Sequence, residues 1–159
     1  MTTPDEFKSV LGRWASGVSV VTTSDDGLLY GLTVSSFSSL SLEPPLILVC
    51  LHNENRMPDM IRRSGGFAVS ILGDDQQEAS NYFARPGREP TRDFTEICGA
   101  WSGVGQPVVD GALAYVVCKT YSLIPQGDHT IVIGEAIETK HRPGRPLIYF
   151  DRAYRSLVD

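Results

Sequence analysis

The spacing of apolar residues changes once near the start of the chain, from a helical period to a strand period. Four apolar residues recur on one helical face: Phe7, Val10, Leu11 and Trp14. In front of them, Thr3 is a preferred N-cap residue, Pro4 suits the first helical position and Glu6 stands three residues after the cap. The pattern predicts an N-terminal helix that ends at Gly17.

Beyond that helix the pattern is typical of β-strands. Asp25-Asp26-Gly27 predicts a tight hairpin turn, and residues 125–129 predict a five-residue turn between the two longest strands. The run 46–51 is apolar throughout, which predicts a central strand buried on both faces. The short runs rich in β-branched and apolar residues predict seven strands, over residues 18–23, 28–36, 46–51, 67–72, 112–124, 130–138 and 146–150.

Two more short helices interrupt the strands. One begins near Pro58, and the other follows Asp75-Gln76-Gln77-Glu78, whose spacing is typical of a capping box. Most connections between consecutive strands are too short for parallel crossovers. The sequence therefore predicts a mainly β fold with peripheral α: one domain over residues 1–159, built as an antiparallel β-barrel with two to three short helices at its ends.

Composition and charge exclude several classes of protein. The net charge of −5 argues against a nucleic-acid-binding protein and against attachment to anionic lipid. The longest apolar run, residues 45–51, is far shorter than the about 20 residues of a membrane helix. Three cysteines do not form a disulfide framework, and Cys50 and Cys118 lie in apolar runs that predict buried thiols; Cys98 is the third. We expect a soluble, cytoplasmic protein.

Several common catalytic motifs are missing. The chain has no GxxxxGK phosphate loop, and Gly103-Val104-Gly105 has Val108 where a dinucleotide fingerprint requires glycine. No paired CxxC, HExxH or GxSxG occurs. These observations argue against a Rossmann site, against a metal site and against a serine-hydrolase triad.

The most distinctive stretch is rich in hydroxyl groups. Six of the nine residues from Thr33 to Ser41 carry a hydroxyl, and apolar strands flank them. Such a stretch forms either a polar strand end capped by its own hydroxyls or a shelf of donors and acceptors along a ligand pocket. Composition alone leaves both interpretations open.

The run GLTVSSFSSLSLEPPLILVCL, residues 31–51, resembles the signature of the flavin reductase-like family, whose members have an FMN-binding split-barrel fold. Four other segments resemble family strands in the same order: residues 15–23, 66–72, 127–134 and 146–150. The resemblance implies a homodimer that uses NADH or NADPH to reduce FMN or FAD. It also implies that free reduced flavin passes to a separate flavin-dependent monooxygenase.

The same resemblance implies the residues that contact the flavin. Residues 52–58 form the loop that meets the phosphate, although Met57 and Pro58 stand where family members usually have serine or threonine. The helix that begins near Pro58 adds its positive end to this loop. By the resemblance, the flavin ring would contact Thr33, Val34, Ser35 and Ser36, and the ribityl chain or the phosphate would contact Ser39 and Ser41. The phosphate would contact Asn53, Asn55 and Arg56. Phe83 and Ala84 would contact further parts of the flavin.

His129 is the candidate catalytic residue. By the resemblance, His129 and Asp128 lie in the turn over which nicotinamide stacks on the flavin, and Tyr154 lines the same cleft. Hydride would pass from nicotinamide C4 to flavin N5, and His129 would orient the carboxamide. His52 and His141 are expected to be surface residues. The alternative is a non-catalytic flavin-binding split-barrel protein for storage or redox sensing.

Overall fold

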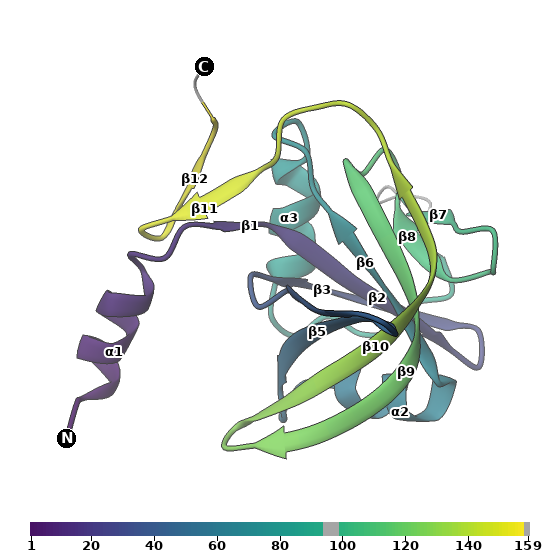
Figure 1. The fold of residues 1–159 in the computed structure, drawn as a ribbon, viewed down its shortest axis with the longest axis horizontal. Helices are drawn as coiled ribbons and strands as arrows, with labels where there is room; N and C mark the ends of the chain where they lie inside the picture. The colour runs from purple at the N-terminus through teal and green to yellow at the C-terminus, as the bar shows by residue number, and fades with distance from the viewer. Residues whose placement is uncertain (94–98, 158–159) are drawn as a thin grey trace.

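The computed structural model describes residues 1–93 and 99–157, so Cys98 lies outside the described residues. Its main sheet has the strand order β3-β2-β6-β9-β10-β5-β4, and every neighbouring pair is antiparallel. The two edge strands, β3 and β4, follow each other in the chain but do not pair, so the barrel is split between them (Figure 1). The seven strands are β2 Ser19–Asp25, β3 Leu28–Val34, β4 Ser38–Leu42, β5 Pro45–His52, β6 Gly66–Ile71, β9 Ala114–Gln126 and β10 His129–His141.

Two small sheets and three helices complete the described fold. α1 (Pro4–Leu11) projects away from the barrel beside the sheet of β1, β11 and β12, whereas α2 (Met57–Ser64) and α3 (Gln77–Ala84) lie against the barrel (Figure 1). The expected mainly β split barrel with short peripheral helices is confirmed. The small sheets contain β1 Ser16–Gly17, β11 Ile148–Phe150 and β12 Ala153–Arg155, and β7 Gly99–Trp101 with β8 Pro107–Val109.

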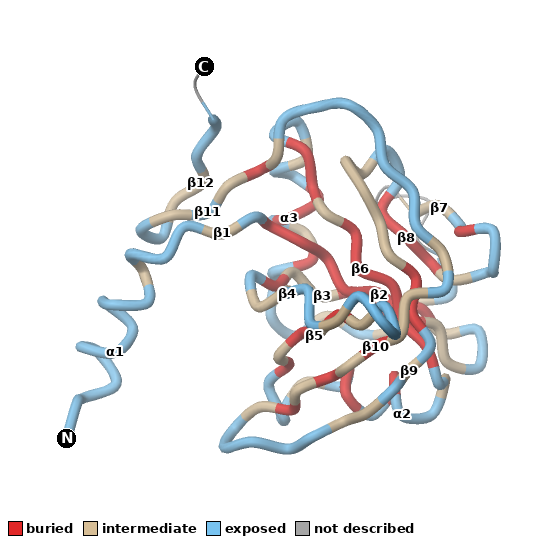
Figure 2. Tube along the Cα trace, in the orientation of Figure 1, coloured by how far each residue is buried: buried red, intermediate tan, exposed pale blue. Residues whose placement is uncertain are grey.

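The buried residues gather on the central strands of the barrel (Figure 2). The largest cluster includes Phe67, Val49 and Val132, and a second one includes Phe83 of α3 and Val20 of β2. Gly134 on β10 shows how tightly the walls approach, because a Cβ there would come within 2.5 Å of the Phe67 ring. Among the described residues, no helix is long and apolar enough to cross a bilayer.

The loop after α3 covers the edge of β3. Leu29 and Thr91 exchange two backbone hydrogen bonds of 2.6 and 2.9 Å, and the Arg88 guanidinium donates to the carbonyl oxygen of Gly31. Arg88 also lies over the rings of Tyr30 and Tyr82. An exposed strand edge is a site of unwanted pairing, and this loop covers it.

The prediction that residues 46–51 form a strand buried on both faces is wrong. β5 alternates between buried residues and half-buried ones, and Leu48 and Cys50 lie on its outer face. The alternation arises because one face packs on the core while the outer face has no covering layer. Cys50 is therefore half-buried, whereas Cys118 is buried as predicted and burial raises the pKa of its thiol to about 12.

Two boundary predictions are also wrong. The turn between β9 and β10 has two residues, Gly127 and Asp128, and not five, because the strands pair as far as Gln126 and His129. Gly127 has a φ of +60°, which glycine adopts without strain. The N-terminal helix ends at Leu11, before Trp14 and Gly17.

The two predicted capping boxes have different outcomes. At α1 the box is confirmed: Glu6 N–H donates to Thr3 Oγ1 at 3.3 Å, and Thr3 N–H donates to Glu6 Oε2 at 2.8 Å. At α3 it is wrong, because Gln76 precedes the helix and its side-chain oxygen accepts the N–H of Gly73.

Candidate functional site

The predicted ring-binding residues connect the two edges of the split barrel. Residues 35–37 lead from β3 to β4, and the Ser36 hydroxyl bonds to both the carbonyl oxygen and the N–H of Cys50, at 2.9 and 3.0 Å. Thr33 Oγ1 donates to the carbonyl oxygen of Ser80 at 2.7 Å. These two hydroxyls therefore hold the connection in place, while the exposed Ser35 side chain is free to face a ligand.

Ser35 lies between two cavities that adjoin each other. The smaller cavity, of about 180 Å³, brings together Thr33, Ser35, Ala84 and Tyr154. The larger cavity, of about 940 Å³, lies between α1, residues 35–38 and residues 149–152. The larger volume is in the range of ordinary ligand pockets, about 300–1,000 Å³.

Tyr154 fixes β12 to α3 at the wall of the smaller cavity. Its hydroxyl lies 2.7 Å from Ser80 Oγ and 3.1 Å from Asn81 Oδ1. Phe83, in contrast, is 1% exposed and packs against Gly31. Phe83 is thus a core residue, whereas Val34, although buried, also lines the smaller cavity.

The residues predicted to meet the phosphate lie in two separate places. Ser39 and Ser41 on β4 pair with Ile47 and Leu46, near the start of β5. Asn53 directly follows His52, the last residue of β5. His52 is six residues beyond Leu46, which corresponds to about 20 Å along a strand. One phosphate cannot contact both sets.

The set beyond β5 is largely engaged in local contacts. The Asn55 side chain accepts the N–H of Met57 at 2.9 Å, where α2 begins. Arg56 pairs with Glu89 at 2.8 Å, which joins this loop to the loop after α3. Met57 and Pro58 are buried, so their departure from the family pattern places apolar side chains in the core rather than in the pocket.

Asn53 holds the turn between β9 and β10. Its side-chain N–H donates to the carbonyl oxygen of Gly127 at 3.2 Å, and its side-chain oxygen accepts from Thr130 Oγ1 at 2.8 Å. Its backbone N–H also donates to the carbonyl oxygen of Asp128 at 2.9 Å. The position of Asp128 and of the next residue, His129, is therefore fixed by the loop after β5.

A cluster of three titratable side chains surrounds this turn. β5 and β10 pair so that His52 stands directly opposite His129, with ring centroids 5.1 Å apart at 75°. Asp128 Oδ1 lies 2.7 Å from His129 Nδ1, and Asp128 Oδ2 lies 3.8 Å from His52 Nε2. The hydrogen bond from His129 is the main reason that the pKa of Asp128 is lowered. His52 is exposed, as expected from the sequence, but its contact with His129 was not predicted because only the strand register shows it.

The strand register also brings the hydroxyl-rich connection close to the histidine turn. Cys50, which holds Ser36, stands opposite Ile131, two residues beyond His129. Two residues along a strand span about 7 Å and point to the same face of the sheet. The side chains of Cys50 and His129 therefore lie on one outer face of β5 and β10, and Ser36 bonds to the backbone of Cys50 at the edge of β5 that faces β4.

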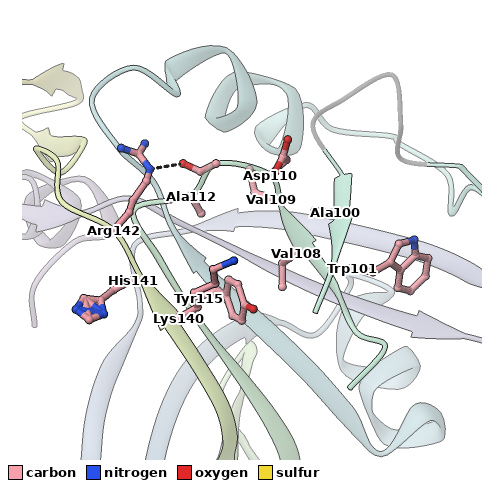
Figure 3. Close-up of a pocket in the computed structure, with 11 residues that line it drawn as sticks. Ala100, Trp101, Val108, Val109, Asp110, Ala112, Tyr115, Lys140, His141 and Arg142 are labelled. Carbon is pink, nitrogen blue, oxygen red and sulfur yellow. Dashed lines mark hydrogen bonds between the residues drawn. The ribbon is translucent and has the colours of Figure 1, made fainter. Parts of the chain in front are cut away.

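A further cavity, of about 240 Å³, lies at the opposite end of the β9–β10 hairpin (Figure 3). Tyr115, Lys140 and Val108 line it, and Arg142 Nε donates to the carbonyl oxygen of Gly111 at its rim, at 2.8 Å. None of the predicted site residues lines this cavity. Within residues 1–93 and 99–157, no group of three or more histidine, cysteine, aspartate or glutamate side chains is placed to hold a metal ion.

The barrel that is split between β3 and β4, with the two adjoining cavities beside residues 35–38, is typical of a class of flavin-associated β-barrels. The sequence profile of the flavin reductase like domain matches residues 11–158, and the chain belongs to this family. The family assignment confirms the resemblance that the sequence motifs predicted.

Individual relatives agree with the family assignment over nearly the whole of this chain. A Rhodococcus protein named NADH-dependent flavin reductase is 37% identical over 98% of this chain and 87% of its own. The reductase component of a Thermus thermophilus 4-hydroxyphenylacetate 3-monooxygenase is 36% identical over 97% of both chains. The structure of the flavin reductase PheA2 has a TM-score of 0.90, with 34% identity over 99% of this chain and 100% of PheA2.

Proposed function

We propose that this protein catalyses the reduction of FMN or FAD by NADH or NADPH and releases the reduced flavin to a separate flavin-dependent monooxygenase. One observation carries the proposal: the Ser36 connection bonds to β5 at Cys50, and the strand register places Cys50 only two residues along the sheet from the His129 turn. The names of the relatives support it, since one is an NADH-dependent flavin reductase and another a monooxygenase reductase component. A third, in Streptomyces globisporus, is an NADH:FAD oxidoreductase whose structure, with a TM-score of 0.90 and 29% identity over 99% of this chain and 96% of its own, contains NAD and FAD fragments.

The residues present fit a flavin. The groove offers the exposed Ser35 hydroxyl, the backbone of residues 35–37 and the aromatic side chains of Tyr149 and Tyr154 around the smaller cavity. Ring binding needs hydrogen-bond donors along one edge and apolar contact elsewhere, and this lining has both. When bound, the flavin supplies the hydride acceptor.

The chain's own residues position the two reactants. The Asp128 carboxylate accepts a hydrogen bond from the Nδ1–H group of His129. The other ring nitrogen, His129 Nε2, then remains available to bind the carboxamide of the donor. The rigid Ser36 anchor fixes the donors of the connection where negative charge develops on reduction. Asn53 is engaged by the turn, Asn55 by the N–H of Met57 and Arg56 by Glu89, so any contact of this loop with the flavin phosphate would add to these local bonds.

The activity is tested by measuring NADH and NADPH oxidation with and without added FMN, FAD and riboflavin. We expect turnover that depends on added flavin, with NADH as the better donor in line with the names of the relatives. The alternative, a non-catalytic flavin-binding protein, predicts a yellow protein that oxidises neither donor. An absence of turnover with every pairing would refute the proposed function.

We also propose that the protein is a homodimer. α1 has a capped, regular helix, yet it buries none of its residues in the single chain. Phe7, Val10 and Trp14 are 55%, 69% and 77% exposed, and the outer face of β5 is likewise uncovered. Exposed apolar clusters of this kind mark interaction surfaces, and a second copy would cover them.

The homodimer is tested by light scattering coupled to size exclusion. We expect the wild-type protein to have twice the chain mass and the double variant Phe7→Glu/Trp14→Glu to shift toward monomer. A monomeric wild type at micromolar concentration would refute the dimer.

The half-buried thiol Cys50 and the buried thiol Cys118 are free, which supports a reducing, cytoplasmic setting.

A further inference from the structure

We propose that His52 is a positioning residue for the nicotinamide donor, acting through Asp128 on the ring of His129. The inference rests on the proposed function, because it assigns a residue to the same site. Three side chains carry it: His52 ends β5, Asp128 lies in the turn between β9 and β10, and His129 begins β10.

The first argument concerns the tautomer of His52. The backbone N–H of Glu54 donates to His52 Nδ1 at 3.2 Å, so Nδ1 acts as an acceptor and carries no proton. In the neutral ring the proton then lies on Nε2. That nitrogen is the one facing Asp128 Oδ2, at 3.8 Å. The loop after β5 thus orients an N–H dipole toward the carboxylate.

The second argument concerns the carboxylate itself. One oxygen of Asp128 is 2.7 Å from His129 Nδ1, and the other faces His52. Asp128 is 77% exposed, so without a second partner its carboxylate could rotate freely in water. With His52 on one side, the carboxylate keeps one oxygen toward His129 Nδ1.

The third argument concerns the ring of His129. The rings of His52 and His129 meet edge to face, with centroids 5.1 Å apart. This contact and the hydrogen bond to Asp128 together restrict both torsions of the His129 side chain. Its Nε2 therefore points out from the sheet as an acceptor for the carboxamide N–H of a nicotinamide.

Two substitutions separate this role from a merely structural one. The amide nitrogen of glutamine can replace His Nε2, whereas the side-chain oxygen of asparagine can replace His Nδ1. We expect His52→Ala to raise the KM for NADH about fivefold, with little change in kcat and in the Kd for flavin. His52→Gln restores the KM, and His52→Asn, which keeps only the contact to Glu54, does not.

A double-mutant cycle tests whether the effect passes through His129. In the His129→Ala background, His52→Ala has no additional effect on the KM for NADH, because the ring that it positions is absent. A further readout needs no turnover: nitrogen-15 NMR of the imidazole of His129 in the flavin-free protein. We expect the Nδ1–H tautomer to dominate in the wild type and in His52→Gln, and the two tautomers to average in His52→Ala.

Each negative result has a distinct meaning. If the wild type oxidises neither NADH nor NADPH with any flavin, the proposed function fails and the NMR result alone decides the inference. If the wild type is active but His52→Ala leaves both the KM and the His129 tautomer unchanged, only the inference fails. Equal effects of His52→Ala with and without His129, or rescue by asparagine rather than glutamine, would also overturn it.

Discussion

The first and last residues of β10 are both histidines, and they have very different surroundings. His129 contacts Asp128 through its Nδ1 and His52 through its ring face. His141 is exposed and pairs with Ala114, and its side chain has no hydrogen-bond or ionic partner among the residues that the structure describes. The histidine at the start of β10 is thus held by side-chain partners, whereas the histidine at its end is not.

The position of each histidine in the sheet explains this difference. At His129, β10 lies between β9 and β5, so partners reach it from both sides. The pairing with β5 stops at Glu135, and beyond that residue only β9 remains beside β10. The comparison teaches that a histidine becomes a candidate for catalysis through its cross-strand neighbours, not through its place in a turn.

The largest expected effect is that of His129→Ala compared with His141→Ala. If His129 orients the donor as proposed, its removal takes away that contact, and we expect the KM for NADH to rise about tenfold or more. The Kd for flavin should change little, because the Ser36 anchor is intact. Steady-state kinetics at saturating flavin and a flavin titration measure the two quantities.

His141→Ala is the matched control, with the same substitution in the same strand. Its kinetics should equal those of the wild type. If both variants raise the KM to the same extent, the difference between the two ends has no functional meaning, and the assignment of His129 is wrong.

Asp128→Asn should have the next largest effect. Asparagine can donate to His129 Nδ1 as well as accept from it, so the tautomer of His129 is no longer fixed. We expect the KM for NADH to rise about threefold to fivefold. Asp110→Asn, an aspartate near the other end of the hairpin, serves as the control. An unchanged KM in Asp128→Asn would show that the carboxylate does not orient the ring.

Asn53→Ala distinguishes two roles of one residue, with a smaller effect. If Asn53 holds the turn, as its bonds to Gly127 and Thr130 indicate, the variant raises the KM for NADH about twofold to threefold with every flavin. If Asn53 binds the flavin phosphate, FMN and FAD bind more weakly while riboflavin does not. Titration of the three flavins decides between these outcomes.

The sequence predicted six of the seven strands of the main sheet, all but β4, and it predicted these strands better than the environment of each. The α1 cap depends on residues three apart, and local chemistry was sufficient to predict it. The burial of β5 depends on what lies across the sheet, and an apolar run cannot distinguish a covered outer face from an uncovered one. The same reason applies to the turn before β10, where tertiary pairing extends both strands through Pro125 and His129.

The candidate site was predictable in part for a related reason. Motifs identify segments, so the stretch from Thr33 to Ser36 and the turn at His129 could be named from the sequence. Contacts between segments depend on register, which explains why neither the contact of His52 with His129 nor the separation of Ser41 from Asn53 could be predicted. Only the pairing of β4, β5 and β10 places these residues relative to one another.

The smallest expected effect comes from the His141 end of the hairpin and involves stability alone. Glu138 accepts hydrogen bonds from the Tyr115 hydroxyl at 2.7 Å and from the N–H groups of Gly103 and Val104, each at 3.0 Å. The hydrogen bond from Tyr115 is the main cause that lowers the pKa of Glu138 below its usual 4.5. Because the folded-state pKa is lowered, the stabilisation is fully present above about pH 4.5 and is lost as the pH falls through the folded-state value.

The variant Glu138→Gln tests how much the hydrogen bonds of Glu138 stabilise the His141 end of the hairpin. We expect a Tm below that of the wild type by a constant amount between pH 6 and 8, and a difference that shrinks below pH 4.5, because the wild-type carboxylate is then protonated. The KM for NADH should not change, since Glu138 lies beyond the pairing of β10 with β5. A Tm difference that grows as the pH falls would contradict the assigned role, and a changed KM would show that the two ends of the hairpin are coupled.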